Sequence, residues 1–101
     1  MKLKVRKLGS FRGLMFRRKP KVPVLITLNG QGIHTWFVFY PIDCVFLDVN
    51  GIALEKKFRI RPFSTYTPRR PASFVVEFPS DNSIVQNISV GKRLDLEVVD
   101  L

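Results

Sequence analysis

The chain has 101 residues, of which 46% are hydrophobic, with nine Phe and seven Pro, and this composition excludes a disordered or fibrous protein. Its one Cys and one His exclude an internal disulfide and a cysteine-based zinc site within a single chain. No apolar run reaches the roughly 18 residues that a membrane-spanning helix needs, so the sequence predicts no membrane span. We expect one domain over residues 1–101, located in the cytoplasm, with no metal, cofactor or membrane partner.

Seven segments have the alternation or the apolar content of β-strands. They are residues 2–8, 22–28, 33–40, 42–49, 52–61, 73–78 and 93–99. Helical turns are expected at residues 10–13, with Ser10 as a cap, and at residues 83–86, with Ser80 as the N-cap. The pattern predicts a mostly β fold with short helices, either a small barrel or a strongly curved antiparallel sheet of six to seven strands.

The dipeptide Asn50-Gly51 is the strongest hairpin signal, because both central residues of a type I′ turn need positive φ angles. A two-residue loop there would pair Cys44 with Lys57 and Asp43 with Phe58, and Asp43 and Phe58 would then lie on the core face. A slip of one residue would exchange the two faces. The acidic face of the last strand is expected beside the basic face of the first.

The formal net charge of +9 lies in the N-terminal part of the chain. Nine Lys and Arg residues precede the first acidic residue, Asp43, whereas residues 43–101 hold eight basic and eight acidic residues. Such a concentration is typical of a polyanion-binding surface, and it also favours solubility and guards edge strands against aggregation. Both interpretations stay open.

Several blocks of this chain resemble the domain of unknown function 192 family. They are Arg12–Arg17, Ile33–Thr35, Phe37, Tyr40–Asp48 and Val76–Pro79. The resemblance covers nearly the whole chain and implies a compact, mostly β fold, but it implies no activity because the family has no established biochemical role. Val38-Phe39 replaces a Met-Arg pair typical of the family, and Pro79-Ser80-Asp81 replaces its Pro-Ala-Gly. Any ligand contact made by that arginine is therefore missing here.

His34 and Asp43 interrupt an otherwise apolar run, and an unpaired buried carboxylate costs several kcal/mol. Asp43 is therefore hydrogen-bonded for the sake of the fold or held for chemistry. We predict a small binding or accessory domain whose ligand, a small molecule or a protein, occupies a pocket at His34, Thr35, Trp36 and Asp43. An enzyme with a His34 and Asp43 acid–base pair is a further hypothesis, although no nucleophile, cofactor loop or metal set accompanies the pair.

A nucleic-acid-binding module is the alternative prediction. Its basic residues would be Arg12, Arg17, Arg18, Lys19, Lys57, Arg59 and Arg61. The aromatic residues at positions 36, 37, 39 and 40 have the composition of a base-stacking surface, although aromatic residues on both faces of a strand usually belong to the core. Cys44 beside Lys57 is either a thiol with a lowered pKa or a small core residue.

Overall fold

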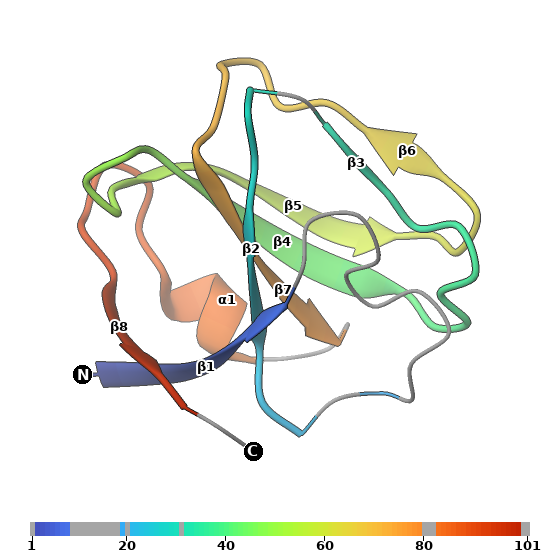
Figure 1. Cartoon of the computed structure of the whole chain (residues 1–101), viewed down its shortest axis with the longest axis horizontal. Helices are drawn as coiled ribbons and strands as arrows, with labels where there is room; N and C mark the ends of the chain where they lie inside the picture. The colour runs from blue at the N-terminus through green and yellow to red at the C-terminus, as the bar shows by residue number, and fades with distance from the viewer. Residues whose placement is uncertain (1, 9–18, 20, 31, 80–82, 100–101) are drawn as a thin grey trace.

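The computed structural model describes residues 2–8, 19, 21–30, 32–79 and 83–99, and its described elements are eight strands and one helix (Figure 1). They are β1 (Lys2–Leu8), β2 (Val24–Thr27), β3 (Ile33–His34), β4 (Ile42–Leu47), β5 (Ala53–Ile60), β6 (Thr65–Tyr66), β7 (Phe74–Pro79), α1 (Ser83–Asn87) and β8 (Asp95–Val98). The prediction of a mostly β fold is confirmed. No helix in the described part of the chain is long enough to cross a membrane.

Six strands form one sheet in the order β5-β4-β7-β2-β1-β8, and β3 and β6 form a separate ribbon. The expectation of an antiparallel sheet is wrong for two of its five strand pairings, because β1 runs parallel to both β2 and β8. The N-terminal half of β1 pairs with β8 and its C-terminal half pairs with β2. The sheet is not closed into a barrel, and β5 and β8 are its two described edge strands. Near these edges an isolated antiparallel bridge joins Ile52, just before β5, to Arg93, which precedes β8.

The predicted contact between the first and last strands is confirmed. Lys2 lies opposite Asp95 and Lys4 lies opposite Glu97 in the parallel β1–β8 pair. Opposite charges at paired positions of neighbouring strands favour this pairing. The acidic residues belong to β8, which lies at the edge of the described sheet.

Strand β4 is buried along its whole length, which explains the nearly unbroken apolar run in the sequence. Its two faces contribute to two different clusters of core residues. Ile42, Cys44 and Phe46 belong to one cluster, and Val45 and Leu47 belong to the other. A central strand with both faces covered must be apolar at successive positions, as is typical of buried strands.

The turn between β4 and β5 has three residues, not the predicted two. The Gly51 N–H donates to the Asp48 carbonyl at 3.0 Å, and Gly51 adopts a φ of 81°. The Asp48 carboxylate accepts the N–H groups of Asn50 and Ile52 at 2.8 and 3.0 Å. This is a type I turn followed by a left-handed glycine, which the Asp48 side chain stabilises. The predicted pairing of Cys44 with Lys57 is still correct, because irregularities lie on both sides of it.

The expected strand at residues 33–40 is much shorter, since β3 ends at His34 and the chain then turns. The short strand β6, which pairs with β3, was not predicted from the sequence. The helix expected near residue 83 is present as α1. The helical turn expected at residues 10–13 and the Ser80 cap lie outside the described residues.

Candidate functional site

Asp43 has a structural partner. Its side chain is 2% exposed, and its Oδ1 accepts the backbone N–H of Arg59 at 2.8 Å. The β4–β5 register shifts at this point, so that Phe58 and Arg59 together oppose Asp43, and Arg59 adopts a φ of 54°. Asp43 therefore satisfies an amide that a β-bulge removes from the ladder. The bulge also turns Phe58 outward to 41% exposure, so its predicted place on the core face is wrong.

Thr35 joins two loops from its buried position. Its hydroxyl accepts the Ser64 N–H at 2.8 Å and donates to the Arg61 carbonyl. Its own carbonyl accepts the N–H groups of Phe63 and Val38 at 2.8 and 3.1 Å. One fully buried side chain thus links residues 35–38 to residues 61–64.

His34 lies beside Trp36, with their ring centroids 5.3 Å apart. Its Nδ1 atom is buried and has no hydrogen-bond partner among the described residues. None of the described hydrogen bonds joins His34 to Asp43, which instead accepts the Arg59 amide. The pocket and the acid–base pair predicted from these residues stay predictions.

The two loops joined by Thr35 expose an aromatic surface made of Trp36, Phe37, Phe39 and Phe63. These side chains are between 42% and 64% exposed, and the Phe63 ring meets the rings of Phe37 and Phe39 edge to face at 5.6 and 5.7 Å. Phe37 and Phe63 adopt φ angles of 60° and 56°, which are rare and costly for bulky residues. The predicted aromatic residues are thus exposed, except for the half-buried Tyr40.

Cys44 is a core residue and not a reactive thiol. Burial raises its pKa well above the ordinary value, and the nearby Glu77 and Asp43 side chains add to the shift. Lys57, its cross-strand partner, turns its ammonium group toward the Tyr66 ring at 5.2 Å. Of the two interpretations of Cys44, the structure supports the small core residue and contradicts the lowered thiol pKa. Glu77, which lies opposite Cys44 on β7, is also buried, and burial raises its pKa to about 8.

A basic groove runs along β5, an edge strand of the described sheet, and we call it the β5 groove. It encloses about 660 Å³. Its lining residues are Leu54, Glu55, Lys56, Lys57, Phe58, Tyr66, Arg69, Arg70 and Val90. Of the predicted polyanion-binding residues, Lys57 lines it, and Arg59 and Arg61 are exposed farther along the chain. Arg12, Arg17 and Arg18 lie outside the described residues, and Lys19 is exposed.

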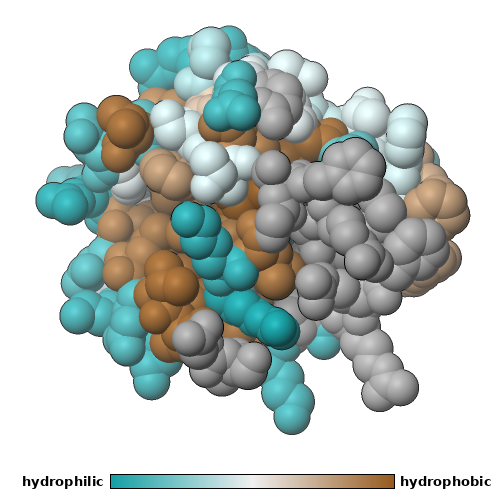
Figure 2. Space-filling model, in the orientation of Figure 1, coloured by the Kyte–Doolittle hydropathy of each residue, from teal (hydrophilic) through white to brown (hydrophobic). Residues whose placement is uncertain are grey.

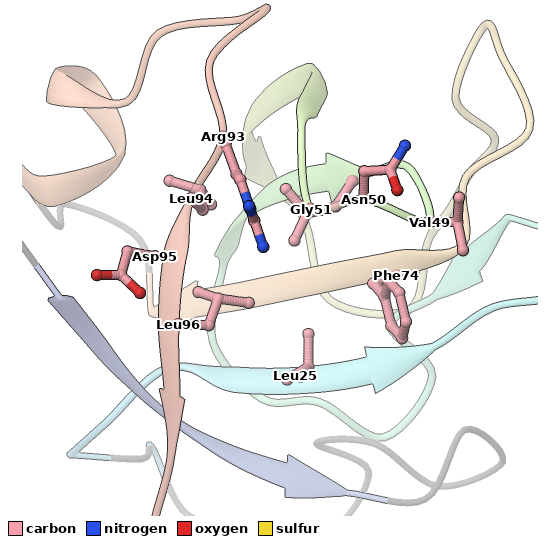
Figure 3. Close-up of a pocket in the computed structure, with 10 residues that line it drawn as sticks. Leu25, Val49, Asn50, Gly51, Phe74, Arg93, Leu94, Asp95 and Leu96 are labelled. Atoms are coloured by element: carbon pink, nitrogen blue, oxygen red, sulfur yellow. The ribbon is translucent and has the colours of Figure 1, made fainter.

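An apolar pocket lies between β8 and the face of β2 and β7, and we call it the β8 pocket (Figures 2 and 3). It encloses about 530 Å³. Its lining residues are Leu25, Leu47, Val49, Asn50, Gly51, Phe74, Arg93, Leu94, Asp95 and Leu96. Figure 2 shows apolar side chains gathered between β8 and β2 on this face. Neither this pocket nor the β5 groove is lined by His34, Thr35, Trp36 or Asp43.

Comparison with known families decides where this chain belongs. Residues 4–96 match the family model DUF192, described as "Uncharacterized ACR". The chain belongs to the DUF192 family. The family resemblance inferred from the sequence blocks is confirmed, and the family has no specific function established.

Archaeal relatives are similar to this chain over most of its length. A UPF0127 protein of Pyrococcus furiosus is 32% identical over 89 residues, which cover 84% of this DUF192 chain and 76% of the relative. A UPF0127 protein of Thermococcus sibiricus is 30% identical over 93 residues, which cover 87% of this chain and 60% of the relative. The chain therefore spans well over half the length of these relatives.

Two solved structures share the fold with a TM-score of 0.74, and each match covers 88% of this DUF192 chain. One is a Sinorhizobium meliloti protein provisionally assigned as a transcription regulator, 21% identical and matched over 78% of its length. The other is a Novosphingobium aromaticivorans protein of unknown function, 15% identical and matched over 71% of its length. At these identities the likeness shows the fold alone.

Sequence reasoning missed both the β8 pocket and the basic residues Arg69 and Arg70 of the β5 groove. The Arg69-Arg70 pair was recognisable as a charged pair in a proline-rich loop, but nothing local indicates that the loop returns to β5. For the β8 pocket the only signal was the alternation of Leu94 and Leu96 with Asp95, which indicated an inward apolar face.

Proposed function

We propose that this DUF192 chain is a small-molecule-binding domain whose ligand, an apolar molecule with one anionic group, occupies the β8 pocket. The observation that carries the proposal is an open pocket of about 530 Å³ with core side chains at its base and a guanidinium group over it. Pockets of about 300–1,000 Å³ with mostly apolar walls and a few polar groups are typical of small-molecule sites.

The walls of the β8 pocket come from strands that are far apart in the sequence. Leu25 and Leu47 are buried core residues of β2 and β4, and Phe74 and Leu96 are half-buried residues of β7 and β8. Transfer of apolar ligand surface from water onto these side chains favours binding by about 25 cal/mol per Å² of area covered. The base of the pocket therefore suits a hydrocarbon or an aromatic ring.

Arg93 supplies the polar recognition. In Figure 3 its guanidinium group projects over the pocket, whereas the Asp95 carboxylate points to the opposite side of β8. Asp95 lines the pocket and lies opposite Lys2 in the β1–β8 pair. A guanidinium group binds a carboxylate through two parallel hydrogen bonds, so an anionic group on the ligand would complete the site.

The rim of the pocket is formed before any ligand binds. The Leu94 N–H donates to the Gly51 carbonyl at 2.9 Å, and Ile52 and Arg93 form a bridge. Asp48 holds the same turn through its side chain. Little backbone ordering would be required on binding, which favours affinity.

Binding of 8-anilinonaphthalene-1-sulfonate, an apolar sulfonate that fluoresces in dry sites, tests the proposal. Leu96→Trp should fill the pocket and lower the affinity by about tenfold or more, because the added ring takes the volume of the ligand. Val98→Trp is the matched control, since Val98 lies on the same strand and is 56% exposed outside the pocket. Equal binding by both variants and by the unmodified protein would reject the β8 pocket as the site.

The anionic group is tested by displacing the probe with octanoate and with octanol. Arg93→Gln should weaken octanoate by about tenfold and leave octanol nearly unchanged, because only the carboxylate uses the guanidinium group. If the variant weakens both equally, Arg93 acts through the shape of the rim and the anionic class is wrong.

A further inference from the structure

We propose that the β5 groove binds single-stranded nucleic acid, with phosphates held by Lys57, Arg69 and Arg70 and a base stacked on Phe58. This inference goes beyond the proposed function, since it concerns a different face and none of the residues of the β8 pocket. Either proposal can fail without the other.

The charge of the groove comes from segments far apart in the sequence. Lys56 and Lys57 are on β5, and Arg69 and Arg70 are in the loop that follows β6. The Lys56 ammonium donates to the Val85 and Ile88 carbonyls at 3.3 and 2.7 Å, so it holds the end of α1. The other three cations are on exposed residues.

Apart from Glu55, the acidic residues in the described part of the chain lie outside the groove. Asp43 bonds to the Arg59 amide, Asp48 caps its turn, and the acidic residues of β8 lie opposite the lysines of β1. Glu77 is buried, and burial raises its pKa to about 8. The carboxylate in the groove, Glu55, already accepts the Tyr66 hydroxyl and the Arg69 N–H, so its charge offsets one cation of four.

Aromatic rings lie among these cations. Phe58 is 41% exposed because the bulge turns it outward, and Tyr66 lies at the wall of the groove under the Lys57 ammonium. Rings interleaved with cations are typical of single-strand sites, where bases stack on the rings and the backbone follows the charges. A simple phosphate site would not need the exposed ring.

The groove lies along an edge strand of the described sheet, which also suits an extended ligand. β5 is the last strand of the sheet order, and the groove takes side chains from both faces of it. Lysines on an edge strand also prevent aggregation, which is the alternative explanation of Lys56 and Lys57. Protection of an edge strand does not explain why Arg69 and Arg70 line the groove, because these residues lie in the loop after β6 and not on β5.

Fluorescence anisotropy with labelled single-stranded RNA and DNA of about 10 nucleotides tests the proposal on the full chain. We compare Lys57→Glu/Arg69→Glu/Arg70→Glu with Lys7→Glu/Lys21→Glu/Lys92→Glu, which reverses three exposed lysines outside the groove. Both variants change the net charge equally. The groove variant should lose at least about tenfold in affinity, and its log–log salt slope should fall by about 2, since each phosphate contact contributes about 0.7.

Equal losses in the two charge variants would overturn the proposal, because binding would then follow net charge and not the groove. If the groove variant does not fold, as judged by circular dichroism, the neutral variant Lys57→Gln/Arg69→Gln/Arg70→Gln replaces it with the same expected direction.

Phe58→Leu separates nucleic acid from other polyanions. It should weaken oligonucleotide binding by about tenfold and leave heparin binding unchanged, because heparin has no bases to stack. Equal effects on both ligands, or none on either, would show that the groove recognises charge alone and would reject nucleic acid as its ligand. A mononucleotide that competes as well as the oligonucleotide would likewise reject a polymer site.

Discussion

Asp43 Oδ1 accepts the backbone N–H of Arg59 at 2.8 Å, and this bond holds the bulge of β5 in place. It explains why a carboxylate stands in the most apolar stretch of the chain. The bulge in turn exposes Phe58 and directs it toward the β5 groove. A buried acid in the core thus determines the shape of a surface.

Replacing Asp43 tests this role. Asp43→Ala leaves the Arg59 amide unpaired, and we expect it to lower the free energy of unfolding by about 2–3 kcal/mol. Asp43→Asn keeps an acceptor oxygen and should cost clearly less. Urea denaturation monitored by Trp36 fluorescence, from the only Trp of the chain, measures both changes. An Asp43→Ala variant of unchanged stability that loses a ligand would favour the predicted binding site at this residue.

Glu77 should make the protein less stable as pH rises. Its pKa is about 8 in the folded protein against 4.5 for an ordinary Glu, so the folded state keeps a proton that the unfolded chain loses. The resulting stabilisation is fully present below pH 4.5, falls as pH rises and is lost above about pH 8. At about 1.4 kcal/mol per pKa unit, the fall should reach roughly 3–5 kcal/mol.

Denaturation of the protein and of Glu77→Gln at a series of pH values checks the sign. Glu77→Gln should remove most of the slope between pH 5 and about pH 8. Glu97 is exposed, so Glu97→Gln is the control and should leave the slope of stability against pH unchanged. A slope that survives in Glu77→Gln would contradict the assignment.

Cys44 should resist thiol reagents while the protein is folded. Burial both shields the sulfur and raises its pKa, so the nucleophilic thiolate is scarce at neutral pH. Reaction with 5,5′-dithiobis(2-nitrobenzoic acid) should therefore follow the unfolded fraction as urea is added. Rapid labelling without denaturant would restore the hypothesis of a reactive thiol.

Thr35 should control the order of the aromatic surface. Thr35→Val removes the hydroxyl that bonds to Ser64 and Arg61, and we expect a loss of about 2–3 kcal/mol in unfolding free energy. Thr35→Ser keeps the hydroxyl and should retain most of the stability. Iodide quenching of Trp36 should rise in Thr35→Val as the loop loosens. Unchanged quenching would indicate that other contacts hold these loops.

Much of the sheet was predictable because its signals are local. The apolar run of β4, the alternation of β1 and the glycine of the Asp48–Ile52 turn each depend on neighbouring residues, and they predicted the pairing of Cys44 with Lys57. The three-residue loop was not predicted, because the Asp48 side chain selects a different turn from the one that Asn50-Gly51 favours.

The sites were harder to predict because they depend on distant pairings. The position of β8 beside β1 was predicted, but nothing in the sequence of β8 indicates that Leu96 lines the same pocket as Leu25 of β2. The bulge at Arg59 requires a left-handed residue that is not glycine, so propensity argues against it. Both features result from tertiary packing.

Titration of ¹⁵N-labelled protein with octanoate, followed by two-dimensional NMR, tests the central claim of a β8 pocket most directly. The account predicts that the amide signals of Gly51, Leu94 and Leu96 move together and saturate, while those of His34 and Trp36 stay in place. Shifts centred on His34 and Trp36 instead, or no saturable shift at the β8 pocket, would contradict it.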